Sequence, residues 1–165
     1  SFKKRVSILK GVNTSAFESV YNNSLKLSPG AKELINFFKS TGVKSAIISG
    51  GLSYFAERLH KCLGVDTFRA NNVEVTNDFL TGVVLGKVID ANEKANYIKE
   101  LCTLHHLKRE QVIAIGDGAN DLEMMKIAGV SVAYHAKPLL QKSCDVIINN
   151  SGLDSLIDFF EEGNC

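Results

Sequence analysis

The sequence predicts an α/β fold in which a parallel sheet lies between two layers of helices. Short segments that are apolar on both faces alternate with segments of helical periodicity, which is typical of a parallel sheet covered on both sides. Polar and glycine-rich loops follow two of the expected strands, "SGG" at 49–51 and "GDGAND" at 116–121. A chain of 165 residues is long enough for one domain with a hydrophobic core and a small subdomain.

The first 27 residues are polar-rich and helical in pattern. Val6, Leu9 and Val12 recur at intervals of three, and Gly11 interrupts the pattern. This spacing predicts two short helices that cannot form a core by themselves. We expect the one domain boundary near residue 27, where this segment gives way to alternating strands and helices.

The next helix is expected to begin at Ser28, the predicted N-cap, with Pro29 at its first position. It ends at Gly42. The stretch "VKSAIIS" (43–49) predicts a buried strand, and the glycine pair 50–51 predicts a tight turn after it.

The rest of the chain continues this alternation. Two alternating segments flank Asn77-Asp78 and predict a β-hairpin at about 71–88. The other expected elements are helices over 53–63, 91–107, 119–128, 137–143 and 153–160, and strands over 111–116, 130–134 and 145–149.

Charge and cysteine content exclude several classes of protein. Lys and Arg (19) nearly balance Asp and Glu (18) along the whole chain, so nothing favours a nucleic-acid or membrane partner. No apolar run approaches the roughly 18 residues of a membrane span. Four cysteines without a CxxC pair predict reduced thiols in a cytoplasmic protein: Cys62, Cys102, Cys144 and Cys165.

Ligands of open parallel sheets bind beyond the carboxyl ends of the strands, where both polar loops are expected. The loop at 49–51 offers the Ser49 hydroxyl and free backbone N–H groups, which suit a phosphate. The loop at 116–121 offers two carboxylates, Asp117 and Asp121, and the Asn120 amide. A divalent cation such as Mg²⁺ could bridge these carboxylates and a phosphate. The alternative is a turn and helix cap with no ligand.

Two basic residues are weaker candidates for the functional site. Lys94 lies near a helix start, where it opposes the helix dipole unless an anion is close. A solvated surface lysine is an equal alternative. By its pattern alone, Arg5 in "KKRVSILKG" is interpreted as a surface charge.

The motifs "IISGG" (47–51), Lys94 in "DANEKA" and "IGDGANDLEMMKIAGVSVAYHAKP" (115–138) resemble motifs two, three and four of the haloacid dehalogenase superfamily of phosphatases. Within it, the chain is similar to the phosphoserine phosphatase family over essentially all its residues. This resemblance implies a HAD-like Rossmannoid three-layer sandwich. Residues 1–27 would be the remnant of a helical cap, residues 28–165 the α/β core, and the hairpin a small insertion.

The resemblance implies Mg²⁺-dependent hydrolysis of a phosphomonoester through an aspartyl-phosphate. The implied substrate is O-phospho-L-serine, in serine biosynthesis. Asp117 would bind Mg²⁺ with Asp121 in support, and Lys94 would neutralise the phosphate and the nucleophile.

The resemblance also assigns substrate contacts. Ser49 and the backbone N–H of Gly50 would hold phosphate oxygens, and Asn120 would position the phosphate. Arg5 would pair with the carboxylate of phosphoserine. Two alternatives remain. One is a HAD phosphatase for another small phosphomonoester, and the other is a non-catalytic HAD-like protein that binds a phosphate ligand or has a regulatory role.

The sequence departs from the family at its first motif, DxDx(T/V), which supplies the aspartate nucleophile and the general acid/base. No Asp-x-Asp occurs in the 165 residues, which begin with Ser1, and no strand is expected before residue 43. The first, central strand is therefore expected to be missing from this chain, which would be inactive alone. Two strand edges would then face a gap and pair with a missing N-terminal segment or with another copy.

Overall fold

The computed structural model describes residues 1–162. Cys165 and the last residues of the predicted core lie outside the described part. The chain forms two compact units: the first unit contains residues 1–27 and 43–89, and the second contains 28–42 and the chain from residue 90. Residues 43–89 thus group with the N-terminal segment, whereas the assignment of 1–27 to a cap stays a prediction.

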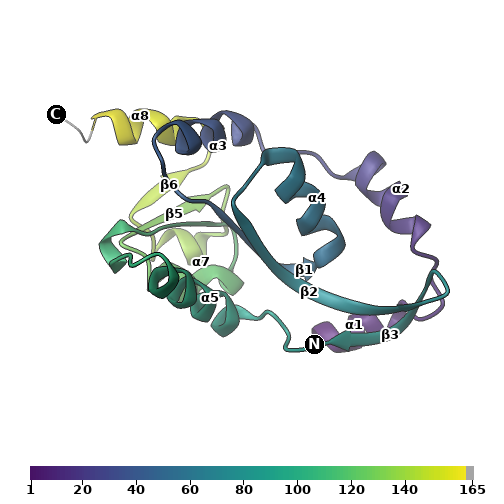
Figure 1. The fold of residues 1–165 in the computed structure, drawn as a ribbon. Coiled ribbons are helices and arrows are strands. Elements are labelled where there is room, and N and C mark those ends of the chain that lie inside the picture. Colours follow the sequence, from purple (N-terminus) through teal and green to yellow (C-terminus); the bar gives the residue numbers. More distant parts are fainter. Residues whose placement is uncertain (163–165) are drawn as a thin grey trace. The chain divides into compact units, whose positions relative to one another are not determined.

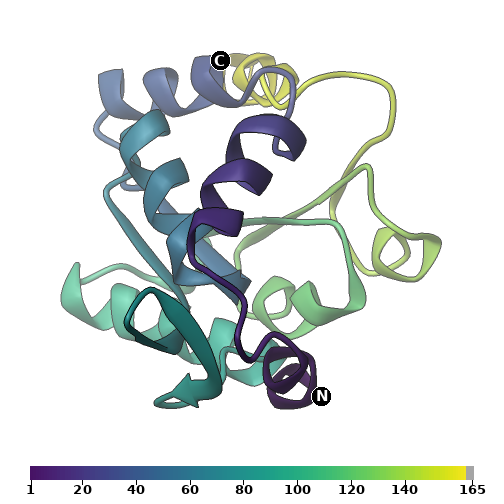
Figure 2. The same cartoon turned by 90° about the vertical axis from the view of Figure 1, so that its right-hand side faces the viewer.

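The first unit is a three-stranded sheet with helices against it (Figure 1). The strand order is β1-β2-β3, with β2 parallel to β1 and antiparallel to β3. Its elements are α1 (Phe2–Ile8), α2 (Ser15–Ser24), β1 (Ala46–Leu52), α4 (Ser53–Leu63), β2 (Thr67–Thr76) and β3 (Phe79–Leu85). Helix α4 packs on β1 and β2, α1 packs on β3, and α2 lies beside α4 (Figures 1 and 2).

The predicted hairpin is confirmed, with Asn77 and Asp78 at its turn. Their φ angles are 51° and 67°, so both central residues adopt the left-handed conformation that a type I′ turn requires. Asn and Asp tolerate this conformation better than other residues with a Cβ. The hairpin arms, Thr67–Thr76 and Phe79–Leu85, begin earlier than the predicted residue 71.

The second unit is a parallel sheet covered by helices on both faces, as predicted. Its elements are α3 (Ala31–Ser40), α5 (Ala91–Leu104), β4 (Ile113–Gly116), α6 (Leu122–Met125), β5 (Val130–Tyr134), α7 (Pro138–Gln141), β6 (Val146–Ile148) and α8 (Ser155–Glu162). The strand order is β4-β5-β6, all parallel. Helices α3 and α8 cover one face, and α5 lies on the other (Figure 1).

The core of the second unit joins α3 and α8 to the sheet. Its most buried members come from α3, β5, β6 and α8: Leu34, Phe38, Val132, Ile148 and Leu156. Burying such aliphatic and aromatic side chains contributes about 1.5–3 kcal/mol each. This is the packing that sequence periodicity predicts for apolar strands between helices.

The start of α3 differs from the prediction, because Gly30 and not Ser28 is the N-cap. The Pro29 carbonyl accepts a hydrogen bond from the Leu153 N–H (2.8 Å) and is thus turned away from the helix. Gly30 has a φ of 76°, and a Cβ there would collide with Asp154. Only glycine fits this position.

A second difference concerns the predicted helix over 119–128. The structure has a 3₁₀ turn at Ala119–Asp121 followed by the short helix Leu122–Met125. The Asp121 side chain accepts hydrogen bonds from backbone N–H groups of the preceding loop, which favours a tight turn over a regular first helical turn.

Each sheet ends in an edge strand. Within residues 1–162, β1 pairs with β2 alone and β4 pairs with β5 alone. Unpaired N–H and C=O groups at such edges are templates for another strand. This agrees with the prediction of two open strand edges.

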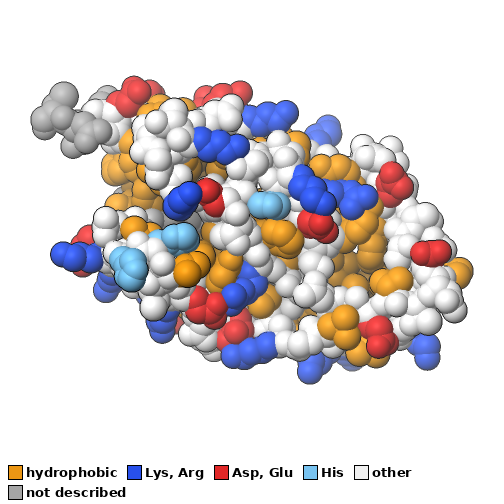
Figure 3. Space-filling model, in the orientation of Figure 1, with side chains coloured by type: hydrophobic (Ala, Val, Ile, Leu, Met, Phe, Trp, Pro, Cys, Tyr) orange, Lys and Arg blue, Asp and Glu red, His pale blue; other side chains and the backbone are white. Residues whose placement is uncertain are grey.

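The surface carries charges of both signs. On the face drawn in Figure 3, basic and acidic side chains are interspersed, as on ordinary globular proteins. Across residues 1–162, no helix combines the length and the apolar character that a transmembrane segment requires. Cys62, Cys102 and Cys144 are free thiols, and burial raises the pKa of Cys144.

A reciprocal hydrogen-bond pair links β5 to the start of β6. The Ser131 N–H and hydroxyl donate to the Asp145 carboxylate (2.8 and 2.6 Å), and the Ser131 hydroxyl oxygen accepts from the Asp145 N–H (3.0 Å). The Ser131 hydroxyl, followed by its backbone N–H, holds the pKa of Asp145 below its ordinary value of 3.8.

We expect Ser131→Ala to destabilise the protein less at acid pH than at neutral pH. A carboxyl with a lowered folded pKa stabilises the fold above its unfolded pKa, and this contribution is lost as pH falls through the folded pKa. The difference in unfolding free energy between wild type and variant should be constant at neutral pH and shrink below about pH 4. Urea titrations at several pH values measure it, with exposed Ser143→Ala as the control. A difference independent of pH would contradict this.

Candidate active site

The loop after β4 is organised around the Asp121 carboxylate, which is only 3% exposed. One of its oxygens accepts hydrogen bonds from the backbone N–H groups of Asp117 (3.1 Å) and Gly118 (3.3 Å). The other accepts from the Asn120 side-chain amide (3.3 Å) and from the Lys94 ammonium (2.6 Å). Asp121 therefore fixes the loop from inside.

Lys94 lies on the first turn of α5 and is 5% exposed. The Asp90 side chain caps this helix by accepting from the Glu93 N–H (2.9 Å). Lys94 opposes the helix dipole there, and the anion that offsets this cost in the structure is Asp121. The interpretation of Lys94 as a solvated surface residue is wrong, because its side chain is buried in an ion pair.

Asp117 differs from Asp121 in that its carboxylate is exposed and, among residues 1–162, makes no hydrogen bond or ion pair. Its backbone is fixed at both ends. Its N–H donates to Asp121, and its carbonyl accepts from the Lys137 N–H (3.1 Å). The loop thus presents one rigidly held carboxylate outside the β4 strand end.

This donor set suits Mg²⁺ better than a metal that needs several protein ligands. Mg²⁺ is commonly held by one or two carboxylates together with water and substrate phosphate. Within the described residues, no three His, Cys, Asp or Glu side chains are grouped to hold a metal between them. Asp117 is the available ligand, while the oxygens of Asp121 already accept four hydrogen bonds.

Gly116, the last residue of β4, allows Asp121 to approach the strand. A Cβ at Gly116 would lie 2.6–2.7 Å from the oxygen, Cβ and Cγ of Asp121. At Gly118 a Cβ would meet mainly the terminal oxygen of Asn120, which can move aside. Neither glycine has a positive φ, so the difference between them is steric.

We expect Gly116→Ala to lower the free energy of unfolding by about 1–3 kcal/mol, because Asp121 must be displaced from its buried position. Gly118→Ala is the matched control in the same loop and should cost less than half as much. Urea denaturation of both variants measures the difference. Equal costs would show that the Asp121 contact does not constrain residue 116.

In the first unit, Ser49, Gly50 and Gly51 lie within β1, and the predicted tight turn after the strand is wrong. Neither glycine has a positive φ. Instead the pairing with β2 shifts between Ile48 and Leu52, so the intervening residues bulge out of the ladder. The Ser49 hydroxyl oxygen accepts a hydrogen bond from the Gly51 N–H (3.0 Å).

Arg5 is exposed on α1, with its guanidinium 5.8 Å from the centre of the Phe2 ring. The structure thus brings together Lys94, Asp117, Asn120 and Asp121 within the second unit. Ser49, Gly50 and Arg5 belong to the first unit. The functional roles of all seven residues stay predictions.

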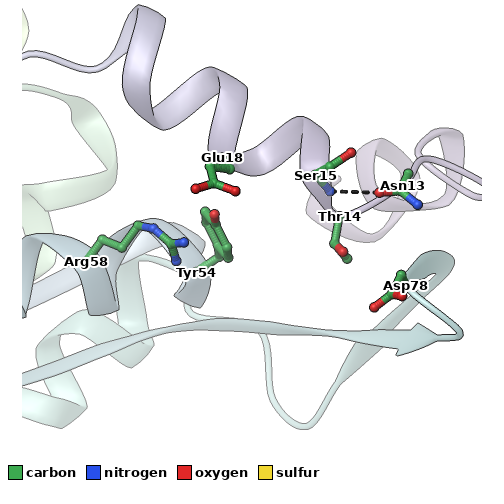
Figure 4. Close-up of a pocket in the computed structure, with 7 residues that line it drawn as sticks. All are labelled: Asn13, Thr14, Ser15, Glu18, Tyr54, Arg58 and Asp78. Carbon is green, nitrogen blue, oxygen red and sulfur yellow. Dashed lines mark hydrogen bonds between the residues drawn. The ribbon is translucent and has the colours of Figure 1, made fainter.

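A separate hollow of about 440 Å³ lies in the first unit, and Figure 4 shows Glu18, Tyr54 and Arg58 gathered at one end of it. The Arg58 guanidinium lies 3.7 Å from the centre of the Tyr54 ring, a cation–π contact. None of the seven predicted site residues lines this hollow: Asn13, Thr14, Ser15, Glu18, Tyr54, Arg58 and Asp78 do. The packing of Arg58 on Tyr54 accounts for this part of the surface without a ligand.

Sequence reasoning missed Asn71, whose side chain is 1% exposed and bonds to the backbone of the loop after Ile48. An asparagine in an alternating strand gives no signal of this kind, because the pattern does not reveal which backbone groups lie opposite it.

Comparison with known proteins identifies the family of this site. A profile of the haloacid dehalogenase-like hydrolases matches residues 2–126. The chain belongs to the haloacid dehalogenase-like hydrolases. The predicted resemblance and the HAD-like fold are therefore confirmed.

Similar members of this hydrolase family are named phosphoserine phosphatases. One from Polaromonas sp. is 42% identical over 162 residues, which are 96% of this chain and 69% of that protein. The crystal structure of an unliganded probable phosphoserine phosphatase from Vibrio cholerae matches with a TM-score of 0.91 at 37% identity, over 95% of this chain and 48% of that one. A structure titled as the phospho-aspartyl intermediate analogue of phosphoserine phosphatase matches with a TM-score of 0.89 at 32% identity, over 95% and 75% of the two chains.

These hydrolases are longer than the present chain. The chain spans about half the length of the Vibrio protein and about two thirds of the Polaromonas protein.

Proposed function

We propose that this protein is a Mg²⁺-dependent phosphomonoesterase and that its substrate is O-phospho-L-serine. The observation that carries the proposal is the exposed Asp117 carboxylate, which has no partner among residues 1–162 and is held rigid by the buried Asp121–Lys94 pair. The names of the similar hydrolases support the choice of substrate.

In the proposed site, Asp117 binds Mg²⁺ with Asp121 in support, and the bound cation supplies charge neutralisation for the phosphoryl group. Lys94 retains N–H groups beyond its bond to Asp121 and directs one to a phosphate oxygen. Asn120 positions the phosphate from the same loop. These four side chains come from a strand-end loop and a helix start, where anionic ligands of α/β proteins bind.

We further propose that Ser49 and the N–H of Gly50 complete the phosphate site. The Ser49 hydroxyl uses its oxygen to accept from Gly51, and its hydrogen is left to donate to phosphate. β-Bulges are often found next to active sites, where they redirect a side chain.

The proposed reaction passes through an aspartyl-phosphate. An aspartate oxygen bonds to phosphorus as the phosphorus–oxygen bond to serine breaks, and a second aspartic acid protonates the leaving serine oxygen. Water then attacks phosphorus and gives a proton to the second aspartate, and the phosphorus–oxygen bond to the first aspartate breaks, which releases inorganic phosphate and restores both groups. A similar protein has been trapped as an analogue of such an intermediate.

The two aspartates of this mechanism form an Asp-x-Asp motif that the 165 residues lack. We propose that residues outside the printed sequence supply it on a strand that pairs with an open strand edge of this chain. The 165 residues alone are then inactive. By this account the whole protein, meaning the product of the complete reading frame, is a cytoplasmic enzyme that acts without nucleic acid or membrane partners.

Arg5 tests the substrate assignment. We expect Arg5→Ala in the whole protein to raise the KM for phosphoserine about 10- to 100-fold, because a charge-assisted bond to the substrate carboxylate is worth about 1.5–3 kcal/mol. Lys4→Ala, a neighbouring exposed cation on α1, is the matched control and should leave KM unchanged. An unchanged KM in Arg5→Ala would reject the carboxylate contact.

The absence of Asp-x-Asp from the printed residues also favours a second candidate, a non-catalytic protein that binds a phosphate ligand. A third is a phosphatase for another small phosphomonoester. Phosphate release by the whole protein, measured with phosphoserine, phosphothreonine and a sugar phosphate, with Mg²⁺ or with EDTA, separates the three. We expect release from phosphoserine with Mg²⁺ only. Binding without release, or a preference for another ester, would replace the proposal by one of its alternatives.

A further inference from the structure

Asn71 is a buried polar residue of the first unit whose side chain hydrogen-bonds to three backbone groups. Its amide nitrogen donates to the carbonyls of Gly50 (3.0 Å) and Gly51 (3.3 Å). Its amide oxygen accepts from the Ile89 N–H (2.7 Å). Buried amides are expensive to leave unpaired, and this one bonds to three backbone groups.

The bulge in β1 explains why these carbonyls need a side chain. The parallel register passes from Ile48 opposite Arg69 to Leu52 opposite Asn71, so the residues between Ile48 and Leu52 outnumber those on β2. The extra residues leave the ladder. Asn71 takes the place of the missing backbone partner.

One of these bonds reaches Ser49 through a single peptide unit. The Gly50 carbonyl and the Gly51 N–H belong to the same planar peptide group, so fixing one fixes the direction of the other. The Gly50 carbonyl accepts from Asn71, and the Gly51 N–H donates to the Ser49 hydroxyl (3.0 Å). A continuous path of two hydrogen bonds and one rigid plane therefore runs from Asn71 to the Ser49 oxygen.

We propose that Asn71 is a positioning residue that sets the orientation of the Ser49 hydroxyl and of the adjacent backbone N–H groups toward a phosphate. This inference rests on the proposed function, in which Ser49 and Gly50 bind the phosphoryl group. Asn71 does not touch the substrate. Its bond to Ile89, which directly precedes the α5 N-cap Asp90, also holds the chain where it leaves the first unit.

Glycine at 50 and 51 is consistent with this arrangement. A Cβ at Gly50 would lie 3.4 Å from the Ile89 carbonyl oxygen, and one at Gly51 would lie 3.2 Å from the Ser49 hydroxyl. A side chain at residue 51 would therefore press on the Ser49 hydroxyl, whereas one at residue 50 would make an ordinary van der Waals contact with Ile89.

The test compares Asn71→Asp with Asn72→Asp in the whole protein. The first keeps size and shape but replaces both N–H donors by an anionic oxygen that faces two carbonyls. The second makes the same chemical change at the next residue of β2, which is exposed. The probe is inorganic phosphate in the presence of Mg²⁺, and its Kd is measured by calorimetry, which needs no turnover.

We expect Asn71→Asp to weaken phosphate binding at least about tenfold, since misplacement of a binding group by about 1 Å can cost a hundredfold. Asn72→Asp should stay within twofold of wild type. Leu156→Ala, a core change in the second unit, controls for lost stability and should lower Tm without altering Kd. If Asn71→Asp does not fold, Asn71→Ser, which keeps one donor, takes its place with the same expectation.

Phosphate binding by the Asn71 variant within twofold of wild type would overturn the inference, as would an equal loss in Leu156→Ala. These outcomes are distinct from failure of the proposed function. If the wild-type protein binds phosphate but does not hydrolyse phosphoserine, the proposed activity is wrong. The phosphate Kd of the Asn71 variant can still be compared with that of wild type in this case. A wild-type protein that binds no phosphate would overturn both.

Discussion

Asp117→Asn is expected to abolish Mg²⁺-dependent phosphoserine hydrolysis by the whole protein, with a fall in kcat of at least about a thousandfold, since a catalytic metal contributes several kcal/mol of charge stabilisation. The amide removes the negative charge that a hard cation requires from its ligand. The fold should be unaffected, because the loop is held through the backbone N–H and carbonyl of Asp117 and not through its carboxylate.

Glu123→Gln is the matched control for this variant. It makes the same change of carboxylate to amide on α6, in an exposed pair with Lys126. Steady-state rates over a range of Mg²⁺ concentrations measure the effect, and circular dichroism verifies the fold. Substantial Mg²⁺-dependent activity in Asp117→Asn would remove the metal assignment.

Asp121→Ala is expected to lower the free energy of unfolding by about 3–5 kcal/mol, the usual cost of leaving a buried charge without its partner. Lys94, whose side chain is 7% exposed, would lose its 2.6 Å partner. The N–H groups of Asp117 and Gly118 would lose their acceptor as well.

The chain offers a control that differs mainly in burial. Lys126 and Glu123 form a pair at 2.7 Å with side chains 59% and 40% exposed. Exposed pairs contribute about 0–1 kcal/mol, so Glu123→Ala should change stability by less than about 1 kcal/mol. Urea denaturation of both variants measures the contrast, and equal effects would contradict the account of Lys94 and Asp121 as a buried pair.

A double variant, Lys94→Met with Asp121→Leu, tests the origin of the cost. It replaces both charges by apolar groups of similar size, which is often neutral for a buried pair. We expect it to be more stable than Asp121→Ala while remaining inactive. A double variant no more stable than the single one would place the cost in the loop hydrogen bonds and not in the unpaired lysine.

Much of the fold follows from local sequence patterns. Strand β5 (Val130–Tyr134) and helix α4 (Ser53–Leu63) lie where apolar runs and helical periodicity place them. Asn77 and Asp78 predict the hairpin turn because few other residues tolerate a positive φ. These features depend on near neighbours in the chain.

The errors arose where a distant contact decides the conformation. Gly30 caps α3 because Asp154 and Leu153 lie against it, which no window around residue 30 contains. The pair 50–51 was predicted as a turn, but it is a bulge held by Asn71, some twenty residues away. The motif residues Asp117, Asn120 and Asp121 are predictable as a group, whereas the different tasks of the two carboxylates depend on which of them Lys94 reaches.

The central claim is that the Ser49 hydroxyl, the Lys94 ammonium and the Asp117 carboxylate serve one phosphoryl group. A crystal structure of the whole protein with Mg²⁺ and inorganic phosphate tests it most directly. The account predicts phosphate oxygens within hydrogen-bonding distance of Ser49 and Lys94, and the cation between the phosphate and Asp117. Phosphate bound elsewhere, or Mg²⁺ away from Asp117 with Ser49 turned into a different region, would contradict it.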